Sequence, residues 1–247
     1  MLPLKDDVPT RSFPAVTVAI IAANLLVYLY ELALAPPFAP SRVAAAAAER
    51  AYEAFVFEFG LVPCRLGGVC PARLATALAG APDPWLTVFT SMFVHGGLFH
   101  VGGNMLYLWI FGNNVEDSMG KGRFLVFYLL CGVAAAAAQY LSDPRSAVPM
   151  VGASGAVSGT LGAYLILHPN ARVWTLIIFG FFWRVVPIPA LIVLGFWIVV
   201  QVLNGIITFG GGEPGGVAFL AHVGGFVAGM ALILVFRQRP DIAYRRY

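Results

Sequence analysis

The chain has 247 residues, of which 60% are hydrophobic and only 11% are charged, and its mean hydropathy is +0.82. The surface of a soluble domain of this size cannot cover so many apolar side chains, so the composition excludes an ordinary water-soluble enzyme. The formal net charge is +3, and no basic stripe interleaved with aromatic residues indicates a nucleic-acid partner. The sequence therefore predicts a chain that lies largely in a lipid bilayer.

Six apolar stretches are candidates for crossing that bilayer. Hydrocarbon about 30 Å thick needs roughly 20 apolar residues in a helix. The stretch 152–168 is short and rich in Gly and Ser, and we place a span there because its neighbours require a crossing. We expect an all-α polytopic membrane protein with six spans, near residues 13–35, 95–115, 122–142, 152–168, 187–208 and 216–236.

Lysine and arginine residues set the expected orientation, because cytoplasmic flanks carry an excess of them. An N-terminus on the inside places ten of the fifteen basic residues in the cytoplasm: Lys5, Arg11, Lys121, Arg123, Arg172, Arg184, Arg237, Arg239, Arg245 and Arg246. We therefore expect both termini to be cytoplasmic, and the Ala-, Gly- and Arg-rich composition indicates a bacterial inner membrane. A cleaved signal peptide is the alternative for the first span, because Ala33 and Ala35 form an A-x-A-like site.

The connection between the first two spans, residues 36–94, is too long for a simple loop. Ser41 before the alanine run 44–48 predicts a capped helix, and aromatic residues such as Trp85 suit the membrane interface. Cys64 and Cys70 lie in this loop, where an exported, oxidising compartment would permit a disulfide; two free thiols are the alternative. A metal site is not expected, because no His lies near these cysteines in the sequence.

Polar side chains inside apolar spans are costly in lipid and therefore mark candidate functional positions. His100 and Asn104 are four residues apart on the second span and share a helix face, with His95 just over one turn earlier. Ser154 lies at the start of the fourth span, and His222 lies on the sixth. These three spans carry the candidate site.

Small residues flank two of these positions. Gly155 and Gly159 follow Ser154, and Gly225 and Gly229 follow His222. Such rows let membrane helices approach closely, so the imidazole could reach the hydroxyl and take its proton. No Asp or Glu lies in a position to orient the histidine within the membrane, and the sequence therefore predicts a Ser-His dyad.

Four motifs in this order resemble those of the rhomboid intramembrane serine proteases. They are His95-Gly96-Gly97-Leu98-Phe99-His100-Val101-Gly102-Gly103-Asn104, Glu116-Asp117-Ser118-Met119-Gly120, Gly152-Ala153-Ser154-Gly155 and Ala221-His222-Val223-Gly224-Gly225. Two positions depart from the family pattern. Residue 158 is Ser where some members have an aromatic residue that stacks on the catalytic His, and Leu86 follows Trp85 where some members have a Trp-Arg pair.

The resemblance implies a six-transmembrane-helix rhomboid-like bundle in which residues 1–247 form a single membrane domain. It implies that Ser154 is the nucleophile and His222 its base, with an oxyanion hole made by His100, Asn104 and the Ser154 amide. Supporting positions would be His95, Gly152, Gly155, Gly159 and Gly225. Substrates would be single-pass transmembrane proteins cut near the exported face, and the resemblance implies no cofactor and no metal.

Two other functions fit parts of the pattern. A non-catalytic scaffold that binds membrane helices would be marked by loss of the Ser or the His, but both are present. A small proton-coupled transporter could use His100 and His222 as relays, and inverted repeats, which we do not find, would favour it. The sequence gives no prediction of the oligomeric state or of the physiological substrate.

Overall fold

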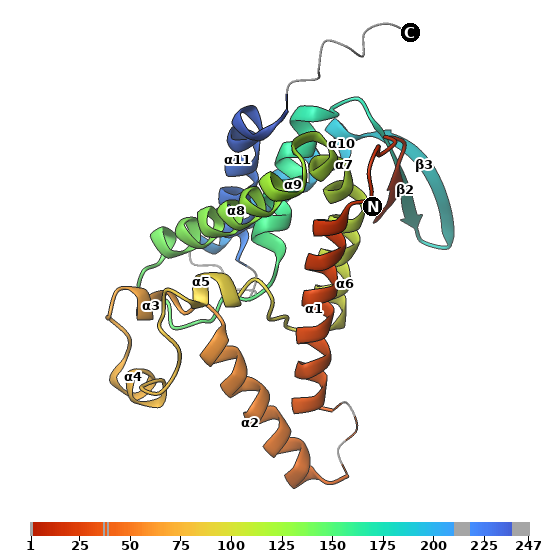
Figure 1. The fold of residues 1–247 in the computed structure, drawn as a ribbon. Coiled ribbons are helices and arrows are strands. Elements are labelled where there is room, and N and C mark those ends of the chain that lie inside the picture. Colours follow the sequence, from red (N-terminus) through yellow and green to blue (C-terminus); the bar gives the residue numbers. More distant parts are fainter. Residues whose placement is uncertain (1, 37, 39, 210–217, 239–247) are drawn as a thin grey trace, which may run out of the picture.

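The computed structural model describes residues 2–36, 38, 40–209 and 218–238. These residues are mostly helical (Figure 1) and contain four helices that are long and apolar enough to cross a membrane. They are α1 (Ala15–Leu34), α8 (Lys121–Ser142), α10 (Ala190–Phe209) and α11 (Phe219–Phe236). They match the first, third, fifth and sixth predicted spans, with ends that differ by at most three residues. Residues 216–217 of the sixth prediction, and Arg239, Arg245 and Arg246, lie outside the described residues.

The other two predicted spans correspond to helices that are shorter or composite. Helix α9 (Ser154–Leu167) is apolar but has 14 residues, and it ends before Pro169. The second predicted span corresponds to α6 (Leu98–Tyr107), the π-helical turn η1 (Leu108–Gly112) and α7 (Asn113–Met119). The backbone stays helical at both joints, so these three pieces follow one another without a break. That the chain crosses the membrane six times therefore remains a prediction.

The expectation of an all-α fold is wrong in one region, because the structure contains a three-stranded antiparallel sheet. Its strands, in the order β1-β2-β3, are β1 (Leu2–Asp6), β2 (Arg172–Phe179) and β3 (Phe182–Pro189). The predicted spans 152–168 and 187–208 leave residues 169–186 as a connection. The segment is rich in β-branched and aromatic residues, and Gly180, with φ of +57°, allows the tight turn between β2 and β3.

The long first loop is partly helical, as predicted. It contains α2 (Arg42–Phe59), α3 (Pro63–Leu66), α4 (Ala72–Ala77) and α5 (Thr87–Thr90). Ser41 caps α2, because its Oγ accepts a hydrogen bond of 3.2 Å from the Ala44 amide. The structure joins Cys64 and Cys70 in a disulfide, which decides between the two alternatives left open by the sequence.

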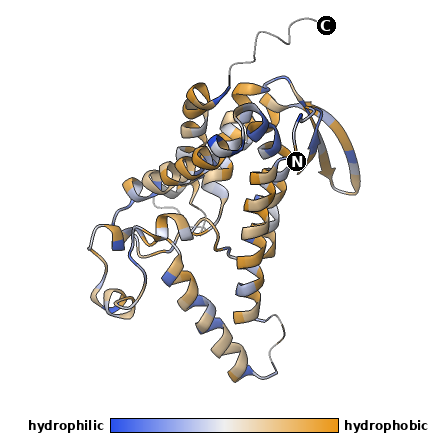
Figure 2. Cartoon of the chain, in the orientation of Figure 1, coloured by the Kyte–Doolittle hydropathy of each residue, from blue (hydrophilic) through white to orange (hydrophobic). Residues whose placement is uncertain are grey.

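Helix α9 occupies the centre of the bundle, and every residue from Gly155 to Tyr164 is buried. Helices α8 and α11 pack against it (Figure 1). The outer faces of the long helices are apolar over most of their length (Figure 2), as expected for surfaces that meet lipid. The core of the fold therefore surrounds the helix that begins at Ser154.

The Glu116 carboxylate, on α7, forms hydrogen bonds with the first residues of α1. It accepts hydrogen bonds of 3.1 Å from the Val16 amide and 2.8 Å from both the amide and the hydroxyl of Thr17. The first amides of a helix have no partner within the helix, and a carboxylate suits the positive end of its dipole. Arg11 and Asp117 form an ion pair of 2.9 Å beside this contact. The Glu116 motif thus fixes the end of the bundle opposite Ser154.

Candidate active site

Ser154 is the first residue of α9, and a glycine two residues earlier shapes its approach. Gly152 has φ of +116°, and its amide donates a 2.8 Å hydrogen bond to the carbonyl of Ser91. A Cβ at position 152 would lie 2.6 Å from Nε2 of His100. Only glycine adopts this positive φ without strain and has no Cβ to collide with His100. Gly152 therefore lets His100 lie close to the start of α9.

Helices α9 and α11 approach until their backbones touch. A Cβ on Gly225 would collide with the carbonyl oxygen of Gly155, and a Cβ on Gly229 would collide with that of Gly159. Backbone atoms cannot move aside as a flexible side chain can. The predicted close packing of the two glycine rows is therefore present in the structure.

This packing brings the imidazole of His222 against the hydroxyl of Ser154. Nε2 of His222 lies 2.7 Å from Oγ of Ser154, and Nδ1 lies 2.7 Å from Oε1 of Gln201 on α10. An amide oxygen can only accept a hydrogen bond, so the proton of the neutral ring is on Nδ1. Nε2 therefore accepts from the Ser154 hydroxyl. Sequence reasoning sought a carboxylate for this position and missed Gln201, although a polar residue in the fifth span was a visible signal.

An aromatic ring also lies against His222, but it does not come from α9. The ring centroid of Trp197, on α10, is 5.9 Å from that of His222, with the planes tilted by 38°. Residue 158, where some rhomboids have an aromatic residue, is Ser here, and its hydroxyl donates a 2.6 Å hydrogen bond to the carbonyl of Ser154. The aromatic contact is thus supplied by a different helix.

His100 and Asn104 present hydrogen-bond donors on the same side of Ser154. The Gly96 amide donates to Nδ1 of His100 over 3.3 Å, which leaves the ring proton on Nε2, the atom nearest Gly152. Nδ2 of Asn104 is buried and has no hydrogen-bond partner among the described residues. A buried donor without a partner is costly, and here it lines a cavity that Ser154 also lines.

His95 lies next to His100, with the two ring centroids 5.1 Å apart. Its Nδ1 donates to the carbonyl of Phe93 over 3.1 Å, and its Nε2 accepts from the Ala153 amide over 3.4 Å. The His95 amide in turn donates to Oε1 of Glu31, a buried carboxylate on α1, over 2.9 Å. Sequence reasoning missed Glu31, although an acidic residue inside an apolar span was a signal of the same kind as Gln201.

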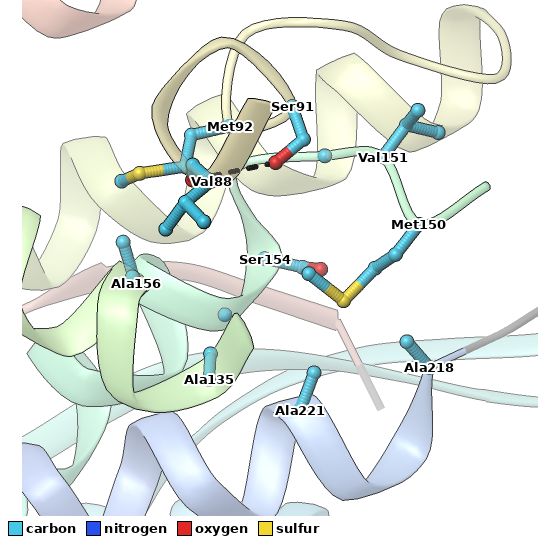
Figure 3. A pocket seen from close by; sticks show the side chains of 13 residues that line it. Val88, Ser91, Met92, Ala135, Met150, Val151, Ser154, Ala156, Ala218 and Ala221 are labelled. Carbon is cyan, nitrogen blue, oxygen red and sulfur yellow. Dashed lines mark hydrogen bonds between the residues drawn. The ribbon is translucent and has the colours of Figure 1, made fainter. Parts of the chain in front are cut away.

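Within the described part of the chain, two cavities border Ser154. The larger, of about 590 Å³, is open, and its lining includes Ser154, His100, Asn104, Gln201 and His222. The smaller, shown in Figure 3, is about 10 Å³ and lies among apolar and small side chains of α5, α8 and α11. Only the larger one has room for a peptide segment. Among the described residues, no group of three His, Cys, Asp or Glu side chains could hold a metal ion.

The sequence is similar to a set of known proteins. A family model described as the rhomboid domain matches residues 82–239, more than half of the chain. RHOMBOID-like protein 1 of Arabidopsis thaliana is 30% identical over 241 residues, which cover 94% of this chain and 56% of that protein. Rhomboid protease GluP of Bacillus subtilis is 38% identical over 92 residues, 37% of this chain and 18% of that protein.

A third relative, Rhomboid-type serine protease 2 of Emericella nidulans, is 27% identical over 168 residues, 67% of this chain and 30% of that protein. This chain therefore spans about half the length of the Arabidopsis protein and a smaller part of the other two. The family match covers α5 to α11 and includes His100, Asn104, Ser154 and His222. The chain is a membrane protein that belongs to the rhomboid family.

Proposed function

We propose that the protein is an intramembrane serine endopeptidase that cleaves single-pass transmembrane proteins near the exported face of the membrane. The observation that carries this proposal is the 2.7 Å contact between Oγ of Ser154 and Nε2 of His222. The opposite nitrogen, Nδ1, lies 2.7 Å from the acceptor Oε1 of Gln201, which favours a ring proton on Nδ1. A serine hydroxyl becomes an effective nucleophile when such a base takes its proton. The relatives named as a protease and a serine protease support the same reaction.

In the first half of the reaction, Oγ of Ser154 attacks the carbonyl carbon of the substrate while its proton passes to Nε2 of His222. The carbonyl oxygen becomes an oxyanion that accepts hydrogen bonds from Nε2 of His100, Nδ2 of Asn104 and the Ser154 amide. His222 then gives its proton to the leaving amine nitrogen, and the C–N bond breaks. In the second half, water repeats these steps on the acyl-enzyme and releases the acid and the serine.

The depth of the site supports a substrate that comes from the membrane. Helix α9 has 14 residues, which span about 21 Å, whereas the hydrocarbon core is about 30 Å thick. If the end of α9 near Leu167 lies at one surface, Ser154 lies below the other. A substrate helix hides its carbonyl groups in its own hydrogen bonds and must unwind before attack, so its exported end, next to water, is the expected place of cleavage.

We also propose the architecture and topology predicted from the sequence. The six-helix bundle consists of the four long helices, α9, and the composite helix from α6 to α7, in one domain. Both termini lie in the cytoplasm, and the membrane is a bacterial inner membrane. His95 and residues Gly152, Gly155, Gly159 and Gly225 support the site by holding α6, α9 and α11 together.

The test is to reconstitute the protein in lipid vesicles with a fluorescent single-pass substrate and to compare it with Ser154→Ala and His222→Ala. We expect both variants to lose cleavage while keeping the melting temperature of the wild type. Equal cleavage by either variant would contradict the mechanism. Absence of cleavage across a panel of substrates that nevertheless bind would favour the scaffold.

A further inference from the structure

Helix α10 contributes two side chains to His222, and they are one helical turn apart. Trp197 lies against the ring, and Gln201, four residues later, contacts Nδ1. Residues at this spacing share a helix face, so this face of α10 is turned toward the base. Gln201 also lines the cavity that contains Ser154.

The orientation of the Gln201 amide decides which ring nitrogen can act as a base. With Oε1 toward Nδ1, as in the structure, the proton is on Nδ1 and Nε2 has a free lone pair. With the amide turned over, its NH2 group would donate to Nδ1, and the ring proton would move to Nε2. In that tautomer Nε2 cannot take the proton of Ser154, and the serine is not activated.

We propose that Gln201 is a positioning residue that holds His222 in the tautomer whose Nε2 accepts the Ser154 proton. This inference rests on the proposed function and extends the expected dyad to a Ser-His-Gln arrangement. When His222 becomes imidazolium, Nδ1 still donates to Oε1, so the ring keeps its place while it carries the proton. Gln201 neither gains nor loses a proton in any step.

Two substitutions of Gln201 distinguish the effect of side-chain size from the effect of the hydrogen bond to Nδ1 of His222. Gln201→Met keeps the length of the side chain and removes the acceptor, and Gln201→Glu keeps an oxygen acceptor whether or not the carboxyl is protonated. We expect Gln201→Met to lower kcat by about 100-fold with little change in KM, within the range for loss of a correctly placed general base. Gln201→Glu should retain kcat to within about tenfold. Val202→Met, on the exposed side of α10, is the matched control and should behave as the wild type.

The tautomer is also measured without any cleavage assay. In protein labelled with 15N-histidine, the ring resonances of His222 are assigned by their absence in His222→Ala. We expect an Nδ1-protonated ring in the wild type and in Gln201→Glu, and a shift toward the Nε2-protonated form in Gln201→Met. Nε2 protonation in the wild type, or unchanged kcat and spectrum in Gln201→Met, would overturn the inference. If the wild type cleaves nothing, the proposed protease function fails, but the spectrum still shows whether Gln201 sets the tautomer of His222. Failure of the proposed function and failure of the Gln201 inference are therefore distinguishable.

A second inference rests on the turn between β2 and β3, where aromatic side chains are exposed. The exposed fractions of Phe179, Phe181, Phe182 and Trp183 are 81%, 101%, 81% and 74%. Figure 1 shows the hairpin extending sideways from the bundle. An exposed apolar group of this kind is unusual on a surface that meets only water.

The hairpin is attached at both ends to apolar helices. Strand β3 ends at Pro189, directly before α10, and the Ala190 amide donates a 2.8 Å hydrogen bond to the carbonyl of Ala171, just before β2. The base of the hairpin therefore lies where α9 ends and α10 begins. The segment 172–189 contains Arg172 and Arg184 and no acidic residue. Aromatic and basic side chains together suit the headgroup region of a bilayer that contains anionic lipids.

We infer that the aromatic turn 179–183 inserts into the headgroup region of the leaflet at the N-terminal end of α1, and that a lipid surface is its partner. Insertion would hold the ends of α9 and α10 at a fixed depth. The inference does not depend on catalysis, because it concerns the end of the bundle opposite Ser154.

The test uses Phe181→Cys, which gives one reactive thiol because Cys64 and Cys70 are paired and Cys131 is buried. The thiol is labelled with a nitrobenzoxadiazole fluorophore in nanodiscs that contain anionic lipid, with unsubstituted protein as the labelling control. We expect strong quenching by lipids that carry a nitroxide near the headgroup and weak quenching by iodide in the water. Strong iodide quenching with no lipid quenching would overturn the inference. So would protection from both quenchers in dimers, because it would assign the turn to a second copy of the chain.

Discussion

Helix α11 packs against α9 and against α10 in different ways. Against α9, it brings backbone to backbone through Gly225 and Gly229, with no side chain between them. Against α10, it places the ring of His222 between Trp197 and Gln201. In the proposed mechanism, the first contact sets the distance between His222 and Ser154, and the second sets the orientation and tautomer of the His222 ring. A larger side chain at Gly225 should therefore disrupt the contact between α9 and α11. The contact between α10 and α11 should instead be weakened by loss of the Trp197 ring or of the Gln201 acceptor.

The largest effect is expected where volume is added between the backbones. Gly225→Leu or Gly159→Leu should abolish cleavage, because a side chain at Gly225 meets the backbone of Gly155 and forces α9 and α11 apart, and one at Gly159 meets Cys131 on α8 and the backbone of Gly225 and displaces α9. Cleavage of the reconstituted substrate and membrane insertion are measured together, and insertion should be intact. Gly195→Leu is the matched control, since a Cβ at that glycine on α10 would meet nothing within 4 Å. Retained activity in both core variants would show that this packing does not set the Ser-His distance.

The proposed oxyanion donor Asn104 tests the effect of removing one hydrogen-bond donor without adding volume. Asn104→Ala should lower kcat by about 10²–10³-fold with little change in KM, because the donor acts mainly on the charge that develops during attack. It should not lower the melting temperature, since Nδ2 of Asn104 makes no hydrogen bond within the described residues. Michaelis–Menten kinetics and thermal unfolding check both statements. A rise in KM alone would assign Asn104 to substrate binding.

The ring contact should have a smaller effect. Trp197→Leu removes the aromatic face beside His222 and should lower kcat by about tenfold, because the imidazole gains rotational freedom while Gln201 still holds Nδ1. Trp197→Phe keeps a ring and should retain most of the activity. If both variants cleave as the wild type, Gln201 alone orients the base.

The smallest effect concerns the far end of α9, where Asp6 accepts hydrogen bonds from Tyr164 and Asn114. Burial raises the pKa of Asp6 above its usual 3.8, although the Tyr164 hydrogen bond opposes the shift. The stability that this group contributes is therefore full below pH 3.8 and is lost as pH rises through the folded-state pKa.

Asp6→Asn keeps an acceptor and removes the charge. Its melting temperature relative to the wild type should therefore increase by about 1–3 °C between pH 4 and pH 7. At either pH, Asp6→Asn should cleave substrate at the same rate as the wild type, since Asp6 is remote from Ser154. A melting-temperature difference that is constant with pH would show that Asp6 does not titrate in this range.

The sequence predicted the features that depend on local pattern. Apolar runs located the four long helices, and the spacing of His100, Asn104, Ser154 and His222 on three spans identified groups that the structure brings to one cavity. The β2–β3 hairpin was missed because a short run of β-branched and aromatic residues does not distinguish a strand from a connection. Gln201 and Trp197 were missed because their contact with His222 depends on how α10 is rotated against α11, which no periodicity in one helix records.

Chemical labelling of Ser154 tests the central claim most directly. A fluorophosphonate probe reacts only with a serine whose hydroxyl is activated, and mass spectrometry of the peptides locates the adduct. In the reconstituted wild type we predict an adduct on Ser154, and in His222→Ala no adduct at that residue. Equal labelling of Ser154 in both proteins, or labelling of a different serine in the wild type, would contradict the account that His222 activates Ser154.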